Sequence, residues 1–64
     1  MTIAEFRNRL RLMGLTPRQP CYNGGMVHQD RDGQFHNVPD PATLKPEERE
    51  AILDLLASII GANQ

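Results

Sequence analysis

Apolar residues recur at helical spacing in two stretches of this chain, one near each end. Near the start, one narrow stripe of a helix would hold Ile3, Phe6, Leu10 and Met13. Near the end, the apolar positions of residues 52–60 cover about 160° of a helical wheel at ~100° per residue. Prolines, glycines and short strand-like runs lie between these stretches. The pattern predicts a small α+β domain in the order helix, β-hairpin, helix (αββα).

The first helix is expected over about residues 2–13. Thr2 and Glu5 have the spacing of a capping box, in which the Thr2 hydroxyl accepts a hydrogen bond from the Glu5 amide. Gly14 follows at the position after the C-cap, where a left-handed residue is favoured. Leu12 lies nearly opposite the apolar stripe, so we expect it to be exposed in a monomer.

A loop is expected over residues 14–24. Pro17, Pro20 and Gly24 prevent this segment from forming one continuous helix. Tyr22 is expected to anchor the loop on the core.

A β-hairpin is expected over about residues 25–38. Residues 30–33 fit a type I turn in which Gly33 takes the left-handed bulge conformation. This turn places His28 opposite His36 on one face. The same register pairs Met26 with Val38, Val27 with Asn37 and Gln29 with Phe35. Both faces mix polar and apolar residues, so the pattern leaves open which face meets the helices.

A proline-rich loop is expected over residues 39–45, and the second helix over about residues 46–60. Pro46 suits the first turn of a helix. Gly61 is expected to end the helix. Acidic residues favoured at the positive end of the helix dipole are Glu47, Glu48 and Glu50.

The second helix carries more apolar surface than one core contact needs, since such a contact uses a stripe of about 100°. A two-stranded hairpin offers little cover in return. We therefore expect a homodimer or a protein partner on this helix. The expected surface comprises Leu53, Leu55, Leu56, Ile59 and Ile60. The alternative is that the loop over residues 15–25 covers the remainder through Leu15 and Tyr22.

Length and cysteine content favour a single intracellular domain. A chain of 64 residues forms one domain, residues 1–64, and is marginally stable without a disulfide, a metal or a partner. Cys21 is the only cysteine, so no disulfide forms within the chain. A lone thiol without a visible secretory signal predicts a cytoplasmic location. The apolar stretch near the end is too short to span a bilayer.

Charge is distributed unevenly, although the net charge is only −1. Residues 1–20 hold four arginines against Glu5, a balance of +3. Residues 40–64 have a balance of −3. This polarity favours head-to-tail pairing or a charged partner at either end.

The basic half offers one candidate binding surface. Its members are Arg7, Arg9, Arg11 and Arg18. Such a set can contact the phosphates of a nucleic acid, dock an acidic protein or form a solvated helix surface. On a helix these arginines project in different directions, and no aromatic platform is interleaved with them. The only aromatic residues are Phe6, Tyr22 and Phe35.

The predicted hairpin brings two imidazoles together and raises the question of a metal. His28 and His36 as cross-strand neighbours, with Cys21 nearby, resemble a three-ligand zinc site. The spacing matches no known zinc pattern, and paired polar residues on a solvated sheet face are the commoner cause of such a pair. Cys21 with either histidine is also the only nucleophile–base pair, and a small half-buried cysteine is the simpler reading. We expect no cofactor and no enzymatic activity.

Residues 6–10 and 14–16, Phe-Arg-Asn-Arg-Leu and Gly-Leu-Thr, resemble the opening of phage-repressor-type helix-turn-helix domains. That resemblance implies DNA binding by a recognition helix directly afterwards. Here the chain continues with Pro20, Cys21 and the pair Gly24-Gly25.

The order helix, strands with Asp32-Gly33, then Val38-Pro39 and a helix resembles the HicA family of small RNA-cleaving toxins. The resemblance implies RNA binding. That family has its catalytic histidine directly after a Gly-Ser pair and is usually basic. Here Gly24-Gly25 is followed by Met26-Val27, and His28 comes later.

Together these features predict a non-enzymatic interaction module that self-associates through its second helix and binds, or inhibits, another protein. A phage-encoded or accessory protein would suit so short a chain. The alternative is a nucleic-acid-binding module, or a HicA-like RNA-binding protein, that uses the first arginines and His28. A small metal-binding protein or RNase with His28 and His36 is the third hypothesis.

Overall fold

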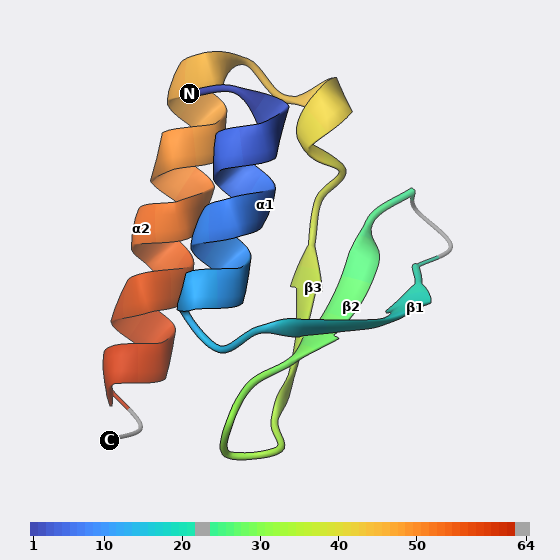
Figure 1. The fold of residues 1–64 in the computed structure, drawn as a ribbon, viewed down its shortest axis with the longest axis vertical. Helices are drawn as coiled ribbons and strands as arrows, with labels where there is room; N and C mark the ends of the chain where they lie inside the picture. Colours follow the sequence, from blue (N-terminus) through green and yellow to red (C-terminus); the bar gives the residue numbers. More distant parts are fainter. Residues whose placement is uncertain (22–23, 63–64) are drawn as a thin grey trace.

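The computed structural model describes residues 1–21 and 24–62, with the backbone alone for Ala62. Two helices lie side by side along one flank of a three-stranded antiparallel sheet (Figure 1). The predicted α+β class is confirmed. The elements are α1 (Ile3–Leu12), β1 (Thr16–Pro20), β2 (Met26–Gln29), β3 (Phe35–Val38), the 3-10 turn η1 (Pro41–Thr43) and α2 (Pro46–Ala62).

Local signals define both ends of α1 as predicted. The Thr2 hydroxyl accepts a hydrogen bond from the Glu5 amide at 3.0 Å, which satisfies one free N–H of the first turn. Gly14 takes a φ of +83°, a conformation that costs glycine little. The Leu15 amide then bonds back to the Leu10 carbonyl at 3.1 Å. The chain therefore reverses after α1 and brings Leu15 into the core.

The hairpin of β2 and β3 forms in the predicted register, with His28 opposite His36. Gly33 has a φ of +87° and closes the turn. The face that carries His28 and Val38, both buried, lies toward the helices. Phe35 and Asn37 on the other face are exposed. The structure thus decides which hairpin face is covered.

β1 is the main departure from the expected order. Residues 16–20 lie within the predicted loop 14–24, yet they pair with β2 as a third strand. Pro17 and Pro20 cannot donate to a ladder, and they are tolerated because β1 is at the edge of the sheet. Every residue of β1 is exposed, so no apolar alternation marks it in the sequence. The expected anchoring role of Tyr22 lies outside the described residues.

The expectation that Gly61 ends the second helix is wrong. α2 continues to Ala62, and Gly61 does not take a positive φ. A glycine in the last exposed turn costs only about 1 kcal/mol relative to alanine, which a helix packed along its length tolerates.

The core lies where the two helices meet the sheet. Arg49 of α2 links the start of the chain and η1 to this core. The Arg49 guanidinium donates to the carbonyls of Pro41 and Met1, each at 2.8 Å. Leu15 belongs to this core. The alternative to a dimer, in which residues 15–25 cover part of the second helix, had predicted this position. The buried cluster consists of Phe6, Leu10, Leu15, Val38, Leu53 and Leu56.

Candidate functional site

Two neighbouring hollows lie between α1 and the sheet. The first has a volume of about 210 Å³ and runs from Phe6 toward Pro39. The second has a volume of about 360 Å³ and runs toward Pro17. Arg7, Leu10 and His28 line both, so the hollows form one open depression, the α1–sheet groove.

Two arginines from α1 line this groove. Arg7 and Arg11 are one helical turn apart and are both exposed. Arg11 donates to the Asn8 side chain at 2.8 Å, which steadies its guanidinium. In the described part of the chain, no carboxylate lies within 4.0 Å of either guanidinium. Both charges are therefore available to an anion from outside.

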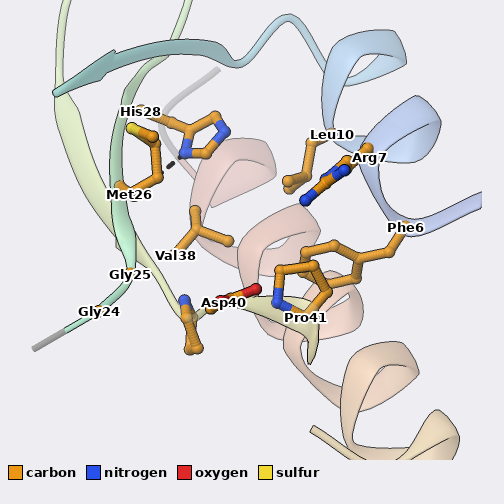
Figure 2. Close-up of a pocket in the computed structure, with 11 residues that line it drawn as sticks. Phe6, Arg7, Leu10, Gly24, Gly25, Met26, His28, Val38, Asp40 and Pro41 are labelled. Carbon is orange, nitrogen blue, oxygen red and sulfur yellow. Dashed lines mark hydrogen bonds between the residues drawn. The ribbon is translucent and has the colours of Figure 1, made fainter. Parts of the chain in front are cut away.

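His28 lines the groove from β2. Its Nδ1 donates to the Met26 carbonyl at 3.1 Å, because a carbonyl oxygen can only accept. In the neutral imidazole this leaves Nε2 as an acceptor. Figure 2 shows the ring of His28 and the side chain of Arg7 on opposite sides of the cavity, with the side chain of Leu10 between them in this view. The histidine is only 7% exposed, so its orientation is set by packing.

The two ends of the groove differ in charge. Asp40 belongs to the first hollow, where its carboxylate accepts from the Ala42 amide at 3.0 Å and caps η1. The second hollow has no acidic residue in its lining. An anion therefore fits best at the second end. The lining there is Arg7, Leu10, Arg11, Leu15, Thr16, Pro17 and His28.

The histidine pair does not form a shared metal site. His36 Nε2 lies 2.7 Å from Asp30 Oδ2, so its partner is a carboxylate of the turn. Cys21 donates to Asn37 Oδ1 at 3.2 Å, and Asn37 lies on the other face of the sheet. Within residues 1–21 and 24–62, no three acidic, histidine or cysteine side chains are grouped closely enough to hold a metal. The alternative site of Cys21, His28 and His36 is not assembled.

Asp30 has a larger role than its place in the turn suggested. It accepts from the backbone amides of Asp32 and Gln34, both at 2.9 Å, as well as from His36. The hydrogen bond from His36, helped by the two amides, holds the pKa of this carboxyl below its ordinary value of 3.8 against the opposing effect of burial. The hydrogen-bonded pair of Asp30 and His36 therefore links the turn to β3.

The fold separates the four arginines of the predicted binding surface. Arg7 and Arg11 reach the groove, whereas Arg9 is exposed but does not line it. Arg18 donates through Nε to Gln29 Oε1 at 2.9 Å, away from the groove. Sequence reasoning missed Thr16 and Pro17 as groove residues. Both had been assigned to a loop, and no local signal places them against His28.

The expected interaction surface of α2 is also divided. Leu53 and Leu56 are buried in the core, and Ile60 packs against it. Leu55 and Ile59 remain exposed, at 57% and 41%. Leu12 on α1 is 58% exposed, as expected for a residue opposite the apolar stripe.

No protein family, characterised protein or solved structure was found to match this chain. The helix-turn-helix interpretation is overturned by β1, because Thr16–Pro20 is a strand where a recognition helix would have to begin. The HicA resemblance rests on element order and short motifs alone. Among the described residues, no helix is long and apolar enough to cross a membrane.

Proposed function

We propose that this domain is a nucleic-acid-binding module that holds phosphates of a nucleic-acid backbone in the α1–sheet groove. The observation that carries the proposal is the pair Arg7 and Arg11, which line a hollow without any acidic residue. Arginine presents a planar set of donors that matches a phosphate in a bidentate manner. Thr16 also lines this hollow.

The separation of acidic from basic residues supports phosphate binding, because the arginines of the groove are not neutralised by ion pairs within the described residues. The acidic residues Glu47 and Glu48 lie in the first turn of α2, outside both hollows. A phosphate in the groove would therefore contact the arginines and not these glutamates.

The proposal is a binding function without catalysis. In the groove His28 is the single imidazole, while His36 is paired with Asp30. Acid–base cleavage of a phosphodiester normally uses a second positioned proton-transfer group. Asp40 is already engaged through Oδ1 in capping η1. We place the domain in a reducing cytoplasm, which suits the free thiol of Cys21.

The double variant Arg7→Ala/Arg11→Ala tests the groove. We expect affinity for a short duplex to fall at least tenfold and the slope of log K against log salt to decrease in size by about 2, since two phosphate contacts are lost. Fluorescence anisotropy across a salt series measures both quantities. Arg9→Ala is the control, because it removes one arginine of α1 that lies outside the groove. Equal losses in both variants, or no binding at about 50 mM salt, would contradict the proposal.

Self-association through α2 is a second candidate, favoured by the exposure of Leu55 and Ile59 one turn apart. The buried positions of Leu53 and Leu56 make this surface smaller than the sequence predicted. We expect light scattering at micromolar concentration to give the mass of a dimer, and Leu55→Glu to give a folded monomer. A wild-type protein that is already monomeric would exclude the α2 dimer.

A further inference from the structure

The face of the sheet that points away from the helices carries an exposed aromatic ring. Phe35 is 64% exposed, more than the other large apolar side chains of the described residues. It lies directly across the hairpin from Gln29, and residues paired in this way share one face of the sheet. The helices lie along the opposite flank (Figure 1). The ring is therefore open to a ligand.

An arginine is hydrogen-bonded to the residue that pairs with Phe35. The pairing of β1 with β2 is irregular between Pro17 and Gln19, and Arg18 is the extra residue. Its Nε donates to Gln29 Oε1 at 2.9 Å. The Gln29 amide nitrogen donates in turn to the Gly33 carbonyl at 3.1 Å, so both ends of the glutamine amide are fixed. Gln29, which pairs with Phe35 across the hairpin, thereby fixes the position of the Arg18 guanidinium.

The charge of Arg18 is not balanced by a neighbour. No carboxylate of residues 1–21 or 24–62 lies within 4.0 Å of the guanidinium. One edge of the guanidinium is occupied by Gln29, and its two terminal NH2 groups remain as donors for an anion. An apolar partner would desolvate this charge without pairing it, at a cost in free energy. A ligand that joins a flat ring to an anion satisfies both groups.

We propose that Arg18, Gln29 and Phe35 form a binding site for one unpaired nucleotide of a single-stranded nucleic acid. The base stacks on Phe35, and the phosphate pairs with Arg18, while Gln29 acts as a positioning residue. Stacking on an aromatic side chain tolerates any base and requires one that is not already stacked inside a duplex. We call this surface the Arg18–Phe35 platform. It lies on the face of the sheet opposite the α1–sheet groove and stands independently of it.

Anisotropy with a labelled oligothymidine of about ten nucleotides, and with a duplex of equal length, tests the platform. We expect Phe35→Ala to weaken single-strand binding about tenfold and to leave duplex binding unchanged. Phe35→Trp should retain affinity, because a larger ring still stacks. Arg18→Gln should weaken single-strand binding and reduce the size of its salt slope by about 0.7. Leu12→Ala, at a similarly exposed apolar position outside the sheet, is the control.

Three results would overturn the platform. They are unchanged single-strand affinity in Phe35→Ala, an equal loss in Leu12→Ala, and an equal loss of duplex binding in Phe35→Ala. Phe35, Arg18 and Leu12 are all exposed, and circular dichroism on each variant verifies that the fold persists. The variant pair Arg7→Ala/Arg11→Ala separates the two proposals. If it binds like the wild type while Phe35→Ala does not, the groove is excluded and the platform stands.

Discussion

Replacement of Phe6 by alanine is expected to cost about 3–5 kcal/mol of folding free energy, the usual range for a buried phenylalanine. Phe6 is 0% exposed and contacts a cluster drawn from both helices and the sheet. A chain of 64 residues has a total stability of about 3–10 kcal/mol, at roughly 0.05–0.15 kcal/mol per residue. This single change therefore removes a large part of the stability of the domain.

Urea denaturation followed by circular dichroism measures this loss. Leu12→Ala is the matched control, since Leu12 lies on the same helix and is 58% exposed. We expect that control to change stability by no more than about 0.5 kcal/mol. A Phe6→Ala midpoint close to that of Leu12→Ala would mean that the core is not centred on Phe6.

Acid is expected to destabilise the domain through Asp30. Because the Asp30 pKa is lowered in the folded state, mainly by the His36 hydrogen bond, its carboxylate contributes stability at pH values above 3.8. That contribution is lost as the pH falls through the lower folded-state pKa. Asp30→Asn should reduce stability at neutral pH, since an amide cannot replace a carboxylate that accepts from two amides and His36. It should also flatten the acid limb of the stability curve.

Melting temperatures measured across an acid pH series provide the check. Asp32→Asn is the control, because Asp32 is an exposed carboxylate in the same turn. We expect the control to follow the wild-type curve closely. His36→Ala removes the first cause of the lowered pKa, so an NMR titration should find the Asp30 pKa moved upward. An Asp30→Asn curve that parallels the wild type would disprove the role assigned to this pair.

Much of the architecture could be predicted because its determinants are local. The Thr2 hydroxyl and the Glu5 amide are three residues apart, and Gly14 follows the helix directly. The turn ending at Gly33 fixes the hairpin register, so the opposition of His28 and His36 followed from counting residues. These features depend on backbone geometry within a few residues of each other.

The third strand could not be predicted in this way. Thr16–Pro20 has no apolar alternation and contains two prolines, so its local pattern indicates a loop. Its partners lie in β2, from Pro20 opposite Met26 to Thr16 opposite Gln29. The choice of Met26 and His28 for the covered face likewise depends on where the helices pack, since both hairpin faces are mixed.

The candidate sites also combine features set by local sequence with features set by tertiary contacts. Sequence alone determined the helices, the hairpin register and the cluster of arginines near the start, because propensities, caps and spacing act over short distances. Only the tertiary structure decided that Arg7 and Arg11 meet His28 in a groove and that Arg18 lies beside Gln29 on the other face. It also left Leu55 exposed while burying Leu53. These outcomes depend on contacts between distant segments, which no local pattern encodes.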